Sequence, residues 1–254
     1  MLHSILRHDR TTVLFGLVAV VVLAWVYLLA GAGVEMEPMD MGGGQMMMMV
    51  PEWNLRYAAL IFVMWAIMMM AMMLPSAAPT ILLTSSLASQ QADRRMAPVW
   101  LFSLGYVAVW IVFSLIATTV QWGLDRAGLL SDRMASTSTT LAGAALIAAG
   151  VYQWTPLKQA CLRHCRSPLE FVLRYWRRRL GPLQSGVRHG MDCLGCCWVL
   201  MGLLFIGGLM NVLWIAAIAL LVLIEKTLPW GNRASGVIGA ILAVWGAALL
   251  AKAI

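Results

Sequence analysis

The chain has 254 residues, of which 61% are hydrophobic and 11% are charged, and its mean hydropathy is +0.82. Soluble globular domains carry about 25% charged residues, so this composition excludes a water-soluble globular protein and indicates an integral membrane protein. The formal net charge is +7, from 18 basic and 11 acidic residues. Because the basic residues gather in short loops, this charge favours a topology signal, and we expect no nucleic-acid partner.

Apolar segments along the chain predict membrane-spanning helices, each of which needs about 20 mostly apolar residues. The candidate spans are residues 12–32, 55–74, 99–120, the shorter Ala- and Gly-rich 136–152, and 234–254. Residues 194–224 carry no charge, and as one helix they would be about 46 Å long against a hydrocarbon core of about 30 Å. Gly207, Gly208 and Asn211 interrupt this segment, which favours a hairpin of helices over 190–208 and 210–226. The predicted fold class is an all-α polytopic membrane bundle of six or seven transmembrane helices.

The distribution of basic residues predicts the orientation of these helices, because Lys and Arg in short loops are retained on the cytoplasmic side. Arg7 and Arg10 precede the first span, residues 31–53 carry acidic but no basic residues, and residues 158–188 are strongly basic. We therefore expect a multi-pass protein of the bacterial inner membrane with a cytoplasmic N-terminus. The first span could instead be a cleavable signal peptide, but its apolar stretch exceeds the usual core of about 7–15 residues, which favours an anchor.

Two regions follow from this organisation. Residues 1–57 form an N-terminal membrane anchor and an outer, acidic, Met-rich loop, and residues 58–254 form the transmembrane bundle. The loop reads MEPMDMGGGQMMMM from Met36 to Met49. A thioether is a soft, neutral ligand that selects Cu(I) over hard cations, so this loop predicts copper binding on the outer side.

Methionines continue into the second predicted span, where Met64, Met68 and Met72 recur every fourth residue. This spacing places them on one helix face, with Met69 and Met73 in a neighbouring row. A soft ion could step along such a ladder of thioethers. Methionine is also a flexible filler of helix interfaces, but the exposed Met-rich loop beside the ladder favours metal binding.

All five cysteines lie between residues 161 and 197, in the motifs CLRHC and CLGCC. We expect both motifs at the cytoplasmic boundary, where thiols stay reduced and structural disulfides are rare. If the first motif is helical, Cys161, His164 and Cys165 project from one side. The surrounding basic residues are expected to lower the pKa of the thiols and favour the thiolate.

The second motif contains a C-x-x-C pair, Cys193 and Cys196, followed by Cys197, and Gly195 permits a close backbone approach. Cys197 alone could be a small packing residue. The sequence identifies no catalytic or cofactor-binding residue. The predicted metal ligands are Cys161, His164, Cys165, Cys193, Cys196, Cys197, Met64, Met68 and Met72.

Other polar and small residues suggest structural roles. Pro75 is expected to end or kink the second helix. We expect Asn211 to cap the hairpin turn and Glu225 to lie at the inner surface beside Lys226. A ridge of small residues on the last helix predicts close packing against another helix, and it consists of Gly239, Ala243, Ala247 and Ala251.

Four sequence blocks resemble a bacterial family described as predicted metal-binding integral membrane proteins. The blocks are MMMAMMLPSAAP, TPLKQACLRHCRSP, CLGCCWVLM and MNVLWIAAIALLVLIEKTLPWG, and the resemblance extends over roughly residues 58–254. It implies metal binding within a membrane bundle and names no reaction. The positions it implies are Met68 to Met73, Pro75, Cys161, Cys165, Cys193, Cys196, Cys197, Asn211 and Glu225.

The leading hypothesis is a membrane protein that binds Cu(I) and transfers it between outer Met thioethers and inner Cys thiolates, in transport, delivery or a chaperone role. Its expected partners are the metal ion, the lipid bilayer, and a metal-donor or acceptor protein or a larger membrane complex. Zinc is an alternative metal at the inner cluster, since Cys and His also suit tetrahedral Zn(II). Two other functions stay open: a membrane thiol-disulfide oxidoreductase that uses the C-x-x-C pair, and a structural or docking subunit.

Overall fold

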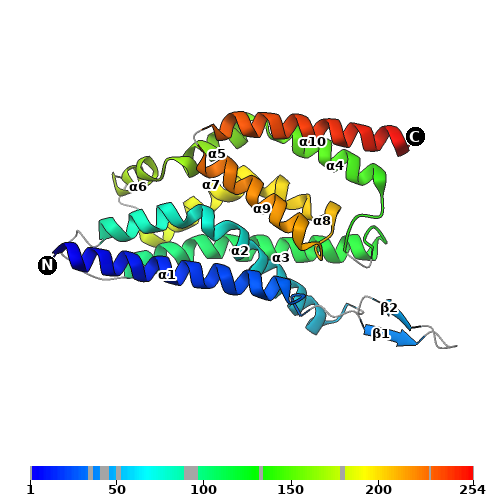
Figure 1. Cartoon of the computed structure of the whole chain (residues 1–254), viewed down its shortest axis with the longest axis horizontal. Coiled ribbons are helices and arrows are strands. Elements are labelled where there is room, and N and C mark those ends of the chain that lie inside the picture. Colours follow the sequence, from blue (N-terminus) through cyan, green and yellow to red (C-terminus); the bar gives the residue numbers. More distant parts are fainter. Residues whose placement is uncertain are drawn as a thin grey trace.

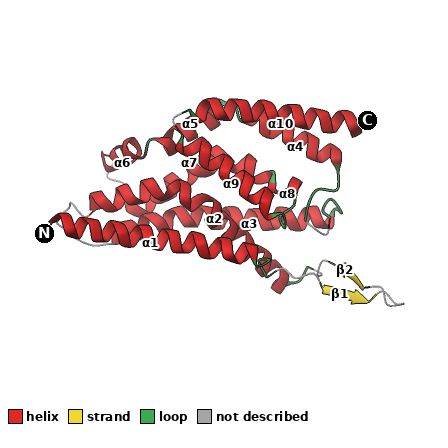
Figure 2. Cartoon of the chain, viewed as in Figure 1, coloured by secondary structure: helices red, strands yellow, loops and turns green. Residues whose placement is uncertain are grey.

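The computed structural model describes residues 2–33, 37–40, 46–49, 53–88, 97–131, 134–177, 181–228 and 230–253. Within these residues the regular structure is helical, apart from a short antiparallel hairpin of β1 (Glu37–Asp40) and β2 (Met46–Met49) (Figures 1 and 2). The predicted all-α fold class is therefore confirmed. Met36 and Met41 of the predicted outer loop lie outside the described residues.

Within the described ranges, five helical segments are long and apolar enough to cross a membrane. They lie in α1 (Leu2–Leu29), α2 (Leu55–Ala88), α3 (Ala97–Arg126), α7 (Pro182–Gly202) with its continuation α8 (Leu204–Gly207), and α10 (Gly231–Ala253). The shorter helices are α4 (Thr139–Tyr152), α5 (Pro156–Arg166), α6 (Pro168–Arg177) and α9 (Val212–Thr227). A bundle of six or seven spans, which requires α4, α9 or both to cross as well, stays a prediction.

The helices form an elongated bundle with two different ends (Figure 1). The start of α1 lies at the same end as α5 and α6, whereas the β1–β2 hairpin, α8 and the C-terminus lie toward the other end. The outward faces are apolar: Phe15 and Leu23 in α1 are 74% and 67% exposed, and Val244 in α10 is 70% exposed. Water would solvate such a surface poorly, whereas lipid chains match it.

Close helix contacts rest on glycine, as at the interface between α4 and α10. A Cβ atom on Gly150 would lie 2.6 Å from the carbonyl oxygen of Gly239 and 3.0 Å from the Cβ atom of Ala243. Any larger side chain there would force the helices apart. The small-residue ridge predicted for the last helix therefore packs at Gly239 and Ala243, and its neighbour is α4 of the same chain.

The interruption predicted in the long apolar segment is present. Gly208 has a φ of +89°, a conformation that suits glycine, and Asn211 caps α9 by accepting a hydrogen bond from the Trp214 N–H at 3.2 Å. Two boundaries differ from the prediction. Helix α7 begins at Pro182 and not near residue 190, and α2 does not end at Pro75 but continues to Ala88.

Candidate metal centre

Three cysteine thiols lie inside the bundle on one face of α7. Cys193, Cys196 and Cys197 are 2%, 1% and 0% exposed. The thiols of Cys196 and Cys197 donate to the carbonyl oxygen of Cys193 at 3.1 and 3.0 Å. Because α7 starts at Pro182, these cysteines lie about three turns into the helix.

A methionine of α2 reaches these thiols. The Sδ atom of Met73 lies 3.9 Å from the Sγ atom of Cys197, and Met73 is fully buried. The sequence placed Met73 in the row beside the predicted ladder, and its role as the contact to the thiols was missed. The ladder residues Met64, Met68 and Met72 are buried as well, at 1%, 0% and 2% exposure.

Helix α5 brings the first cysteine motif against α7. The thiol of Cys165 lies near those of Cys193 and Cys196. Cys161 lies against Gly195, where an added Cβ atom would be 2.8 Å from the Cys161 Sγ atom. We call the thiols of Cys165, Cys193, Cys196 and Cys197, together with the Met73 thioether, the sulfur pocket.

His164 lies on the same side of α5 but contacts a carboxylate. Its Nδ1 atom is 3.5 Å from Asp192 Oδ2, and Arg188 Nε is 3.7 Å from the other oxygen of that carboxylate. The expected lowering of the thiol pKa is wrong for Cys161. Burial raises the pKa of this thiol and Asp192 raises it further, which outweighs the lowering by Arg188.

A buried ammonium group lies among the sulfurs. Lys226 of α9 is 6% exposed, and its Nζ atom donates to Cys193 Sγ at 2.9 Å. The same atom lies 3.7 Å from Met73 Sδ, 4.0 Å from Cys197 Sγ and 3.5 Å from Ser76 Oγ. The pocket therefore holds a cation supplied by the protein itself.

A tyrosine closes the pocket beside Lys226. The hydroxyl of Tyr106, on α3, is 3.1 Å from Cys193 Sγ and donates to the carbonyl oxygen of Met73 at 3.2 Å. Sequence reasoning missed both Tyr106 and Lys226 as pocket residues. The one available signal was a lysine in an otherwise apolar helix, since an ionisable group at membrane depth marks an interior site.

Glu225 is buried inside the bundle, and its expected position at the inner surface of the membrane stays a prediction. It is 1% exposed, and its Oε2 atom lies 2.7 Å from the Nζ atom of Lys158 on α5, which is fully buried. Gln153 completes the network, because its side-chain oxygen accepts from Lys158 and from Ser235, the latter at 3.0 Å. A buried carboxylate needs such partners, and they join the ends of α4, α5, α9 and α10.

The donor set suits a soft ion. Thiols and a thioether favour Cu(I) over hard cations. Across the described residues, however, no three or more His, Cys, Asp or Glu side chains are arranged to hold a metal ion. The Nζ atom of Lys226 lies within contact distance of three of the sulfur atoms that a bound ion would need.

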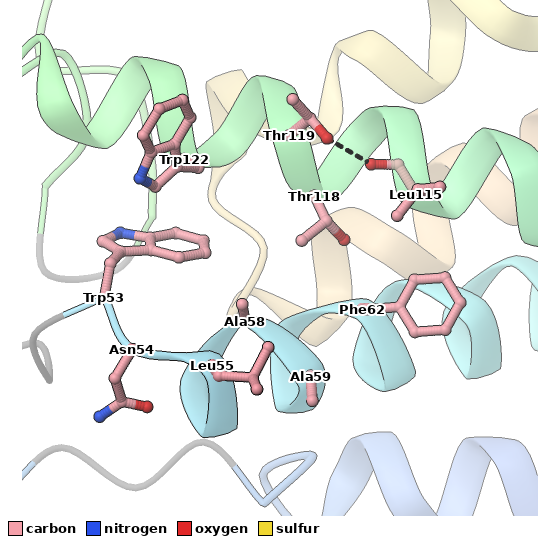
Figure 3. A pocket seen from close by; sticks show the side chains of 10 residues that line it. All are labelled: Trp53, Asn54, Leu55, Ala58, Ala59, Phe62, Leu115, Thr118, Thr119 and Trp122. Carbon is pink, nitrogen blue, oxygen red and sulfur yellow. Dashed lines mark hydrogen bonds between the residues drawn. The ribbon is translucent and has the colours of Figure 1, made fainter.

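A groove elsewhere in the bundle has a different character from the sulfur pocket. It is an open groove of about 590 Å³ between the start of α2 and the end of α3 (Figure 3), and its opening is bordered by Trp53, whose Nε1 donates to Asp125 Oδ2 at 2.6 Å. It offers no sulfur or imidazole ligand. The residues that line it are Trp53, Asn54, Leu55, Ala58, Ala59, Phe62, Leu115, Thr118, Thr119 and Trp122.

Comparison with known families agrees with the chemistry of the sulfur pocket. The family PpoB2, described as a copper chaperone, matches residues 62–249. This range includes every residue of the sulfur pocket and Lys226. No curated protein and no solved structure matches the chain. The resemblance to a metal-binding family is confirmed: the chain belongs to the PpoB2 family of copper chaperones.

Proposed function

We propose that this chain is a membrane-embedded copper chaperone that binds Cu(I) as its cargo in the sulfur pocket. The observation that carries the proposal is the contact between Met73 and Cys197, where a thioether from the Met-rich helix α2 meets a thiol of α7. Soft donors of both kinds converge at one buried place. Such a set holds Cu(I) while excluding water and harder cations.

The surface and the two ends of the bundle support the membrane position that we propose. The apolar outward faces of α1 and α10 contact lipid in this proposal. The end that carries the start of α1, α5 and α6 also carries most of the basic residues, and we place it on the cytoplasmic side of the inner membrane. The Met-rich hairpin then lies on the outer side.

Copper passes along α2 in this proposal. The ladder of Met64, Met68 and Met72 leads from the hairpin end of α2 toward Met73, and a neutral thioether can pass a monocation without a buried charge of its own. At the other end of the pocket, Cys161 is partly exposed and the side chain of His164 is 33% exposed. These two residues are where we propose that copper is exchanged with a partner protein.

The proposed metal is copper and not zinc because of the thioethers. Zn(II) binds thiolate, imidazole and carboxylate, whereas a Met ligand is characteristic of copper. All five cysteines are free thiols in the structure, as metal binding by thiolates requires.

The test is elemental analysis after anaerobic purification and Cu(I) loading. The wild-type protein is compared with a variant in which Cys161, Cys165, Cys193 and Cys196 are changed to Ser, and with Met191→Leu, an exposed methionine on α7. We expect stoichiometric copper in the wild type and in the Met191 variant and its loss in the Ser variant. Equal copper in all three proteins, or none in any, would refute the proposal. Trapping of a mixed disulfide by single Cys variants would support the oxidoreductase instead.

A further inference from the structure

The most unusual feature of the sulfur pocket is that a lysine occupies it. The Nζ atom of Lys226 contacts Cys193 Sγ, Met73 Sδ and Cys197 Sγ at 2.9, 3.7 and 4.0 Å. Lysine is almost never buried without a specific partner, because removing an ammonium from water is costly. Here its partners are the same soft atoms that would bind a metal ion.

Contacts on the other side of α9 fix the position of Lys226. Its neighbour in sequence, Glu225, pairs with Lys158 at 2.7 Å, so the two adjacent residues point to different sides of the helix. The end of α9 is also fixed from α5, since Arg166 donates to the carbonyl oxygen of Leu228 at 2.6 Å. These contacts place the ammonium within the pocket as a built feature of the fold.

We infer that Lys226 is a placeholder cation, which occupies the sulfur pocket in the metal-free protein and is displaced when Cu(I) enters. The inference rests on the proposed function. The ammonium and a copper ion cannot share the same sulfur atoms, because both carry a positive charge and both need contact with Cys193. Ser76 Oγ, at 3.5 Å from Nζ, offers an oxygen acceptor at the edge of the pocket for the displaced head group.

Displacement requires no electron transfer. Cu(I) enters as a monocation and leaves as one, the thiols that bind it release their protons to water, and the ammonium keeps its own. Lys226 thus lowers the affinity of the pocket for copper, which suits a protein that must give up its cargo. In the metal-free protein, Lys226 also gives the buried thiols a hydrogen-bond partner.

The test measures Cu(I) affinity by competition with a chromophoric Cu(I) chelator, and the rate of copper release to it. The variant Lys226→Leu removes the charge and keeps a side chain of apolar character. In the wild type, Cu(I) must break the hydrogen bond of the Lys226 ammonium to Cys193, and a hydrogen bond to a charged group contributes more than a neutral one. Lys226→Leu has no such bond to break. We therefore expect this variant to bind Cu(I) about tenfold more tightly and to release it more slowly. Lys226→Arg keeps the cation and is expected to show no such gain.

Two further variants serve as a replacement and as a control. Lys226→Gln is neutral and polar, and replaces Lys226→Leu if that protein does not fold; it should also bind Cu(I) more tightly than the wild type. Lys252→Leu, at an exposed position near the end of α10, is the control and should leave the affinity unchanged. Equal or weaker binding by the neutral variants would overturn the placeholder role while copper binding stands. Failure of the wild type to bind Cu(I) would refute both proposals.

Discussion

The sulfur atoms of Met73 and Cys197 lie 3.9 Å apart in the interior of the bundle, although 124 residues separate them in the chain. This contact joins α2, which carries the methionine ladder, to α7, which carries the buried cysteines. A copper ion bound by one of these atoms would be within reach of the other. The contact therefore brings together a methionine and a cysteine from the two separate sequence regions in which we predicted metal ligands.

The first prediction concerns Met73. The variant Met73→Leu removes the sulfur and nearly conserves the volume, so we expect it to lower stability by less than about 1.5 kcal/mol. Loss of one soft ligand should weaken Cu(I) binding by about tenfold. The measurement is chelator competition, and Met69→Leu, also fully buried in α2, is the control. Equal loss of Cu(I) affinity in both variants would show that Met73 is not a copper ligand.

The second prediction concerns Gly195. An alanine Cβ atom there would lie 2.8 Å from Cys161 Sγ, so Cys161 must turn away from α7. Alanine is favoured over glycine in a helix by about 1 kcal/mol, and the protein should stay as stable as the wild type or become more so. We expect several-fold faster alkylation of Cys161 in the metal-free protein, measured by mass spectrometry.

The control for this experiment lies in the same helix. Gly202 has no atom within 4 Å of an added Cβ, so Gly202→Ala should leave the reactivity of Cys161 unchanged. An unchanged alkylation rate in Gly195→Ala would mean that Cys161 does not depend on this glycine for its position.

The third prediction concerns the buried ion pair. Lys158→Met leaves the Glu225 carboxylate buried without its partner, and we expect a loss of about 3–5 kcal/mol in the free energy of unfolding. The double variant Lys158→Met with Glu225→Leu removes both charges and should recover most of this loss. Thermal unfolding in detergent, followed by circular dichroism, measures both, with the exposed Lys252→Met as the control. A double variant as unstable as the single one would contradict the assigned pairing.

The fourth prediction concerns the start of α9. Asn211 accepts a hydrogen bond from the Trp214 N–H, and Asn211→Ala should cost about 1 kcal/mol, the usual effect of losing an N-cap. Asn211→Ser keeps an oxygen acceptor and should cost less. The same unfolding experiment applies, and a larger effect of Ser than of Ala would be inconsistent with capping.

Local patterns in the sequence were enough to predict much of the fold. Runs of apolar residues located the long helices, and Gly208 with Asn211 located the break between α8 and α9, because both act through the backbone of their own segment. The start of α7 was placed too late, since residues 182–189 are polar and glycine-containing, a composition that does not distinguish a helix end from a loop. Of the two effects expected of Pro75, an end of α2 is wrong because α2 continues to Ala88, and a kink stays a prediction.

The site was predictable as a set of residue types but not as an arrangement. The motif spacing predicted that Cys161 and Cys165 lie on one side of a helix. In the structure this helix is α5, which packs against α7. Helical periodicity does not fix how α2 is rotated about its axis, so it could not choose Met73 over Met72. Lys226 and Glu225 looked like surface charges because their partners, Cys193 and Lys158, come from distant parts of the chain.

The most direct measurement of the central claim is X-ray absorption spectroscopy at the copper edge of the Cu(I)-loaded protein. The account predicts monovalent copper with sulfur alone in the first coordination shell, and loss of this signal when Cys193 and Cys197 are changed to Ser. A first shell of nitrogen and oxygen, or an unchanged sulfur shell in that variant, would show that copper is not bound in the sulfur pocket.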